Sequence, residues 1–365
     1  MMGDCIQIGV LSDKKFGFVG YIPAISGIVH YNLLMYTVYY YTSRDRFEEC
    51  LPSFCIFGIM NATYAYYMAI VDSMYELHRL INIPRKNIYR DNQRPTNNNR
   101  ICEESINYSI KAYAIKMTVI LISFVGATIG PFYRYMDDGT LVTLYSLKLP
   151  YLHNDLHTEF IVNAIWQLMI TIIGGIGLFL IEGVLTLIDD TVNVSSYLCQ
   201  LEFEELSNCL KNESITIHKS REKLKNIYMK IAYNDEFIKS IGNLFYWRHF
   251  FAPLTFSISI AISIYCQKVM DYPAGYGLAV VSYIQMAVMC FMGQNISDRN
   301  DRLLRALYDF KWYLLPKEDQ KDVRHMLRLL QNEVSFTMGP FKELNFETLK
   351  NLSQKVLPDS CTTVY

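Results

Sequence analysis

The sequence predicts an all-α fold: a polytopic membrane helical bundle with seven spans, the last of which is weak by hydropathy. The 365-residue chain is 51% apolar and 19% charged, and its mean hydropathy is +0.11. Soluble domains carry about 25% charged residues, so this composition favours a chain that places much of its length in lipid. Two further observations, the charge-free stretches and the distribution of Lys and Arg, predict the number of spans and their orientation.

Six stretches of the chain contain no Asp, Glu, Lys or Arg and approach or exceed the length of a spanning helix, about 20 residues. They cover residues 16–43, 50–71, 117–133, 161–181, 249–267 and 272–297. The third is short, but Lys116 can snorkel at its start. The first is too long for the apolar core of a signal peptide, so we interpret it as a true span. The tail carries several charged residues, and hydropathy alone leaves it outside the membrane.

Lys and Arg are distributed unequally between the two sides of the predicted bundle. The connections on the side of the amino terminus carry 26 of them, whereas the connections on the opposite side carry 5. Positive residues accumulate on the cytoplasmic side of membrane proteins, so the amino terminus is predicted to be cytoplasmic. This topology is inverted relative to G-protein-coupled receptors and argues against that class.

The connections on the cytoplasmic side are long and contain amphipathic segments. Leu224, Ile227 and Ile231 recur near helical spacing among basic residues, and Val323 and Leu327 continue the theme near the carboxy terminus. Such helices either lie on the membrane or pack together as a cytoplasmic subdomain. The expected regions are a bundle of six spans over 1–297, a cytoplasmic helical region over 298–340, and the weak seventh span over 341–365.

Motifs for hydrolytic or phosphate chemistry are absent from the sequence. There is no GxSxG, HExxH or P-loop pattern and no Cys/His spacing typical of zinc. His153 and His157 are four residues apart, but no third ligand is evident. The chain is therefore predicted to be no enzyme and to have no cofactor or metal. Because it has no Lys/Arg-rich run, no nucleic-acid partner is expected.

Aromatic and methionine side chains gather in the outer halves of the predicted spans. For any single residue, the ordinary interpretation is bundle core or the aromatic belt at the membrane interface. Together, these residues could form an apolar pocket for a small volatile or lipophilic molecule. The candidates are Phe57, Met60, Phe124, Tyr133, Trp166, Met169 and Tyr276.

The carboxy-terminal third carries motifs that resemble a known family. YDFKWY at 308–313 and FTMGPF at 336–341, together with LEFEELSNCL at 201–210, are similar to the insect odorant receptors. The resemblance implies the same amino-terminus-inside topology and a seventh span near 345–365, whose polar faces would line an ion pore. In that segment, the candidate pore residues are Gln354, Asp359, Ser360 and Thr362.

The resemblance also implies partners and an activity. It implies a plasma-membrane receptor of the olfactory dendrite that binds an odorant among the outer halves of spans two, three, four and six. The receptor would assemble with the odorant receptor co-receptor into a heterotetrameric, odorant-gated, non-selective cation channel. A membrane transporter and a gustatory-receptor-like channel are the alternatives. The sequence shows no internal repeat, which counts against a transporter, and it lacks the gustatory TYxxxxxQF-like ending.

Overall fold

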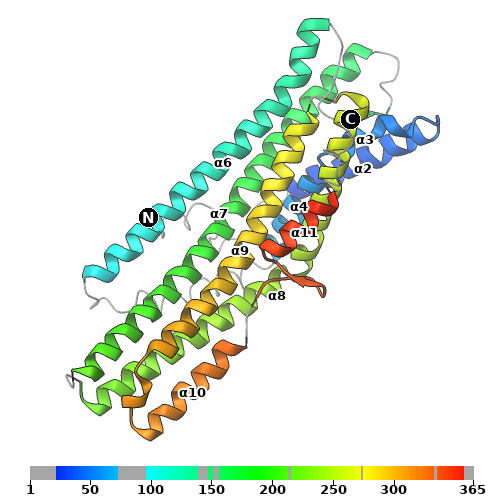
Figure 1. Ribbon diagram of the computed structural model, residues 1–365. Coiled ribbons are helices and arrows are strands. Elements are labelled where there is room, and N and C mark those ends of the chain that lie inside the picture. Colours follow the sequence, from blue (N-terminus) through cyan, green and yellow to red (C-terminus); the bar gives the residue numbers. More distant parts are fainter. Residues whose placement is uncertain are drawn as a thin grey trace, which may run out of the picture.

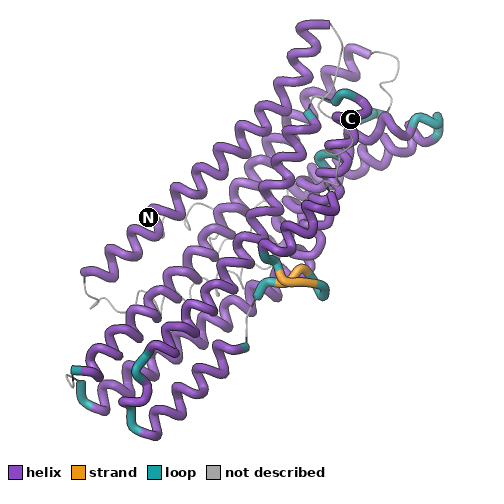
Figure 2. Tube along the Cα trace, viewed as in Figure 1, coloured by secondary structure: helices purple, strands orange, loops and turns teal. Residues whose placement is uncertain are grey.

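The chain folds into an elongated bundle of long helices, shown in Figures 1 and 2. This computed structural model describes residues 22–72, 96–138, 147–150, 156–212, 215–272, 274–332 and 335–356. The long helices are α2 (Ile22–Thr42), α4 (Phe57–Asp72), α6 (Thr96–Asp138), α7 (Leu156–Lys211), α8 (Ile217–Met270) and α9 (Gly275–Asp309). The shorter elements are η2 (Phe47–Cys50), α3 (Leu51–Phe54), η3 (Trp312–Leu314), α10 (Lys317–Gln331), the antiparallel strands β1 (Thr337–Met338) and β2 (Lys342–Glu343), and α11 (Phe346–Val356).

Each of the six charge-free stretches coincides largely with helix, which confirms the all-α prediction. Three helical stretches in the described ranges are long and apolar enough to cross a membrane: His157–Lys211, Ile217–Met270 and Gly275–Asp309. Helix α7 has 56 residues and is therefore about 84 Å long, far more than the roughly 30 Å of a bilayer core. The long helices thus continue well past the predicted spans on the cytoplasmic side.

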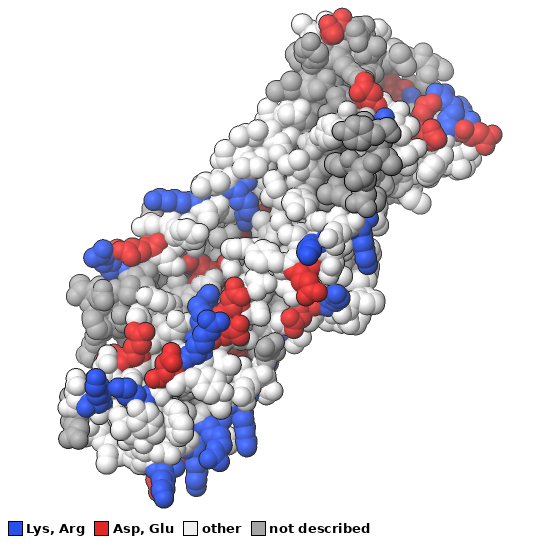
Figure 3. All heavy atoms as spheres, in the orientation of Figure 1, with Lys and Arg blue, Asp and Glu red and all other residues white. Residues whose placement is uncertain are grey.

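Charged side chains follow the same division. Figure 3 shows many Lys, Arg, Asp and Glu residues over the lower part of the visible face, around α10 and the adjoining ends of α7 and α8. Another charged group lies at the outer tip, where Arg44, Arg46 and Glu49 precede and begin the short helix η2. Uncharged atoms cover much of the surface between these regions. This arrangement suits a molecule whose upper part lies in lipid.

A sharp turn joins α8 to α9 at the outer end. Asp271, which follows the last residue of α8, has the left-handed backbone conformation with φ 48° and ψ 48°. Helix α9 then starts at Gly275, where an added Cβ would lie 2.7 Å from the backbone oxygen of Ser263. Because only glycine permits this approach, the two helices can lie in direct backbone contact at their outer ends.

The buried apolar residues form two main clusters along the bundle. The larger lies on the outer side and draws on α4, α7, α8 and α9, with Phe256 and Met286 among its members. The second, which we call the distal cluster, joins the far ends of α7, α8 and α9 to η3 and α10. Leu224, Ile227, Ile231 and Val323 are all buried in it. The amphipathic segments therefore pack together as a subdomain.

A buried polar network separates the two clusters. Arg299 of α9 is fully buried, and its Nη2 lies 2.8 Å from Oδ1 of Asp235 on α8. Its Nε donates to Oγ of Ser196 on α7 at 2.8 Å, and Asn234 Nδ2 donates to the same oxygen at 3.3 Å. On each helix the network residue falls between members of the two clusters. The network therefore fixes how α7, α8 and α9 are aligned along their length.

Asp235→Ala is expected to destabilise the protein by about 3–5 kcal/mol, because it leaves the buried Arg299 guanidinium without its counter-ion. The double variant Asp235→Ala/Arg299→Met is expected to recover most of this loss, since an apolar side chain replaces the charge. The measurement is the thermal unfolding midpoint of the detergent-purified chain.

The matched control is Lys223→Ala, which removes an ion pair with Glu205 whose side chains are both substantially exposed. Its expected cost is below about 1 kcal/mol. Equal losses for Asp235→Ala and Lys223→Ala would contradict the stabilising role assigned to the buried pair.

Candidate functional site

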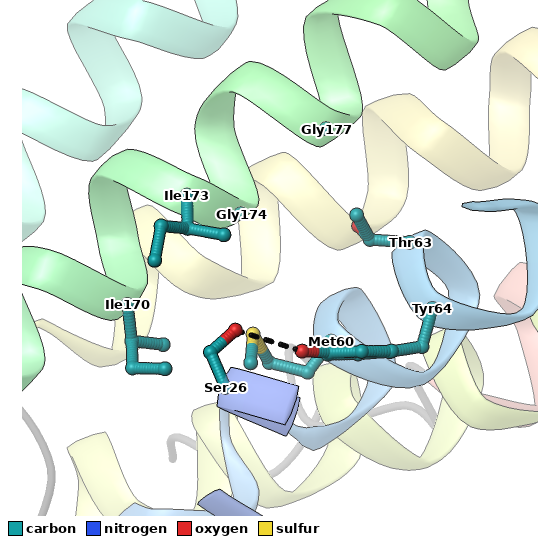
Figure 4. Close-up of a pocket in the computed structure, with 8 residues that line it drawn as sticks. All are labelled: Ser26, Met60, Thr63, Tyr64, Ile170, Ile173, Gly174 and Gly177. Atoms are coloured by element: carbon teal, nitrogen blue, oxygen red, sulfur yellow. Dashed lines mark hydrogen bonds between the residues drawn. The ribbon is translucent and has the colours of Figure 1, made fainter. Parts of the chain in front are cut away.

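A narrow apolar crevice lies where α2, α4 and α7 meet. Figure 4 shows side chains from the three helices converging on it, and its volume is about 20 Å³. Its lining residues are Ser26, Met60, Thr63, Tyr64, Ile170, Ile173, Gly174 and Gly177. About 10–15 Å³ of such space holds one water molecule, so the crevice has no room for an organic molecule until its lining side chains move.

The two glycines of α7 bring this helix close to α4. A Cβ added to Gly177 would lie 3.1 Å from Cγ2 of Thr63, whereas one added to Gly174 would lie 3.8 Å from Sδ of Met60. The first distance is tighter than ordinary packing and the second is normal van der Waals contact. Small residues at such a contact allow membrane helices to approach each other closely. The glycines therefore shape the α7 wall of the crevice.

The crevice has one polar corner. The hydroxyl groups of Ser26 and Tyr64 are 3.1 Å apart, and this hydrogen bond is drawn in Figure 4. The same two helices share a second hydrogen bond, in which the hydroxyl of Tyr31 on α2 donates to Oδ1 of Asn61 on α4. The remaining lining is aliphatic or thioether apart from Thr63, whose hydroxyl donates to the backbone oxygen of Ile59 at 2.8 Å. A ligand here would meet an apolar wall with hydroxyl groups at one side, the usual pattern of small-molecule sites.

Met60 is the crevice residue best suited to move. Its side chain is buried and lies opposite Gly174. Methionine is unbranched and has three rotatable bonds, so it can change rotamer at low cost and fill or vacate space. Movement of this one side chain would enlarge the crevice.

Among the residues predicted from sequence to bind a ligand, Met60 lines the crevice and two others lie in the core around it. The Phe57 ring is 6.2 Å from the Tyr31 ring and 6.0 Å from the Phe54 ring, both edge-on. Trp166 packs against the outer cluster, and its buried Nε1 has no acceptor within the described residues.

The other predicted ligand residues lie elsewhere. Met169 is 42% exposed and Tyr276 is 60% exposed, so both face outward from this single chain. Phe124 and Tyr133 belong to helix α6, but their side chains lie outside the described residues. The role of these four residues in ligand binding stays a prediction.

Sequence reasoning did not select most of the crevice residues. Thr63 and Tyr64 lie three and four positions after Met60, and Ile170, Gly174 and Gly177 repeat at spacings of four and three. Such spacings place residues on one face of a helix. They could have been found by asking which residues share a face with Met60 and with the glycines.

The segment 147–150 contacts both α2 and α7 on the outer side of the bundle. The Lys148 backbone N–H donates to Oγ1 of Thr37 at 2.9 Å, and Nζ lies 3.0 Å from the buried carboxylate of Glu159. Asn163 Nδ2 donates to the Leu147 backbone oxygen at 2.8 Å. This segment therefore ties α2 to the outer end of α7.

The predicted pore segment is described only in part. Helix α11 packs Leu349 and Leu352 against the outer cluster, whereas Gln354 is exposed. Asn345 caps the amino terminus of this helix, because its Oδ1 accepts a hydrogen bond from the backbone N–H of Thr348 at 2.9 Å. The other predicted pore residues, Asp359, Ser360 and Thr362, lie outside the described residues.

Comparison with known proteins gives matches at the level of family and fold. A family model described as 7tm Odorant receptor matches residues 46–355. The structure of the insect olfactory receptor OR5 from Machilis hrabei in complex with eugenol superposes with a TM-score of 0.70 at 13% identity. A second structure of OR5 from Machilis hrabei superposes with a TM-score of 0.71 at 11% identity. Both alignments cover 92% of this chain and 85% of OR5. No curated protein matches the chain.

Alanine substitutions at the two glycines are expected to change the stability of the protein differently. Gly174→Ala should stabilise the protein by about 0.5–1 kcal/mol, because alanine is the better helix former and the new methyl group meets only normal contacts. Gly177→Ala should lose that gain, since Thr63 must shift to admit the methyl group. Thermal unfolding midpoints of the two purified variants provide the test. Identical midpoints would show that α4 does not approach α7 closely at Gly177.

Proposed function

Because the chain belongs to the 7tm odorant receptor family, we propose that it binds a small volatile molecule in the crevice between α2, α4 and α7 and thereby opens a cation channel. The chain is a multi-pass membrane receptor and not an enzyme. The observation that carries the choice of site is the crevice itself. It combines an apolar wall, a hydroxyl corner and a methionine that can change rotamer, at the middle and inner half of the predicted spans.

Ligand binding changes the channel only if the open and closed states differ in affinity for the ligand. The crevice of about 20 Å³ has no room for a volatile molecule, so a ligand must open it in order to bind. A ligand that enters would displace Met60 and hold α4 and α7 in a different packing. That expanded packing is the state that we propose to favour the open pore. One of the two similar structures is a complex with eugenol, which supports a small organic ligand for this chain.

The pore is proposed to form from the carboxy-terminal region 341–365 of several subunits. Gln354, exposed on α11, supports a polar face that is not buried within this chain. Such a face is unfavourable toward lipid but suited to a water-filled path. The region 298–340 would anchor this segment on the cytoplasmic side, and the bundle 1–297 would hold the ligand.

The proposed assembly is a heterotetramer with the odorant receptor co-receptor. Its place would be the plasma membrane of an olfactory neuron dendrite. Non-selective cation flow follows from a pore lined by neutral and acidic polar groups. Gln354, Asp359, Ser360 and Thr362 are the candidates for that lining.

Whole-cell current is the direct test. Cells that express the chain with the co-receptor should show a cation current with some member of a volatile panel, and cells with either subunit alone should not show that response. Surface labelling must confirm that both proteins reach the plasma membrane. Uptake of a ligand without any evoked current would instead favour a transporter.

Met60→Ala is expected to shift ligand preference toward bulkier volatiles, because it enlarges the crevice opposite Gly174. The relative sensitivity to a ligand longer by one or two methylenes should rise about tenfold. The matched control is Met35→Ala on α2, whose side chain is largely exposed and should leave preference unchanged. Half-maximal concentrations from current recordings give the ratio. An equal shift in both variants would remove the crevice as the binding site.

A further inference from the structure

A second and much larger cavity, of about 650 Å³, lies between α6, α7 and α9. Its α7 wall runs through Asp189 and Asp190, which are eight and nine residues beyond the predicted span 161–181. At 1.5 Å per residue, this places them about 12 Å below the end of that span, on the cytoplasmic side. The volume is within the range of small-molecule sites. The proposed odorant crevice shares no lining residue with it.

Two carboxylates on the floor of this cavity receive hydrogen bonds from neutral groups. Asp190 is buried, and its Oδ1 accepts from the hydroxyls of Ser105 at 3.0 Å and Ser109 at 2.8 Å. The amides of Asn193 and Asn295 face Asp189, and Asn295 Nδ2 donates to its Oδ2 at 3.1 Å. Oδ1 of Asp189 is buried and has no donor within the described residues.

The cations that line the cavity are directed to other partners. Lys116 donates its Nζ to Glu182 and, at 3.5 Å, to Thr186. Arg302 donates to Oδ1 of Asn193 at 3.3 Å. Neither forms an ion pair with Asp189 or Asp190 in the described structure. Two adjacent carboxylates therefore face a cavity without a direct counter-ion, an arrangement that favours a positively charged occupant.

The rest of the lining distinguishes an organic cation from a metal ion. From the cytoplasmic half of the predicted span 272–297, α9 contributes Val288, Phe291 and Met292, which form an apolar wall. Toward the cytoplasm, Tyr108 and Tyr197 offer aromatic faces of the kind that attract ammonium groups. The described residues hold no group of three His, Cys, Asp or Glu side chains placed to bind a metal. The cavity thus has an apolar wall, and its charged lining consists of Asp189, Asp190, Lys116 and Arg302.

We propose that this cavity binds an organic ammonium group carried on an apolar chain, with Asp189 and Asp190 as its counter-ions. The chain would lie against Val288 and Phe291 and extend toward the membrane. Two molecules carry this chemistry: a phosphatidylethanolamine of the inner leaflet and a free alkylamine from the cytoplasm. The site is separate from the crevice, with which it shares no lining residue.

Native mass spectrometry of the detergent-purified full chain tests the proposal. The protein is offered phosphatidylethanolamine and phosphatidylglycerol with identical acyl chains, which differ in the ammonium group. The wild type is expected to retain the first about tenfold better, because a charge-assisted hydrogen bond to a buried carboxylate distinguishes them. In a second arm, decylamine is compared with decanol. Binding of decylamine alone would assign the site to a free amine, and binding of the phospholipid would assign it to the inner leaflet.

Two variants link binding to this cavity. Asp189→Asn keeps the shape but removes the charge, and should bring the preference close to one. Ala112→Trp fills the cavity from the exposed surface of α6 and should lower retention even if the first variant fails to fold. Glu204→Gln is the control, since it removes an exposed carboxylate of α7 outside the cavity. The proposal is overturned if the wild type prefers neither ammonium compound, or if both cavity variants retain the wild-type preference.

Discussion

The buried pair of Arg299 and Asp235 is the constraint on which the arrangement of the bundle depends. Removing both charges from water costs several kcal/mol per ion, and only close geometry and further hydrogen bonds offset that cost. Ser196 supplies such a bond from the third helix. Because the network admits little sliding, it holds α7, α8 and α9 in one axial register. Both the crevice and the cytoplasmic cavity take their α7 residues from this fixed frame.

Helix α7 connects the two sites more directly than any other element. Gly177 borders the crevice and Asp189 the cavity, so 12 residues or about 18 Å of one helix separate them. A ligand that changes the position of α7 at one site must change the geometry of the other. Thermodynamic linkage then makes the effect reciprocal: whatever occupies the cavity would adjust the affinity of the crevice. The proposed lipid or amine site would therefore set the sensitivity of the receptor to its volatile ligand.

The spans were predictable from sequence because charges are costly in lipid, so charge-free stretches reveal where the membrane must be. The helix ends were not, since polar residues are free to continue a helix in the cytoplasm, as α7 does to Lys211. The pocket residues were harder to predict from sequence than the helix ends. Met60 and Met169 are equally apolar, and only the packing of α4 against α7 separates the buried one from the exposed one. Asp235, the partner of Arg299, lies 64 residues away in the sequence, so no local sequence pattern reveals the pair.

The length of the helices gives the molecule a mechanical property. Helices α7 and α8 have 56 and 54 residues and run from the outer side of the bundle to the distal cluster. Ser196 divides α7 into arms of about 60 Å and about 22 Å, so a tilt of on the order of 3° at this residue displaces their ends by roughly 3 Å and 1 Å. The buried network at Ser196 would serve as the pivot, so a small tilt of the helix at one site would move its far end by a few ångströms. A receptor built this way needs no large rearrangement at its ligand to report binding on the far side of the membrane.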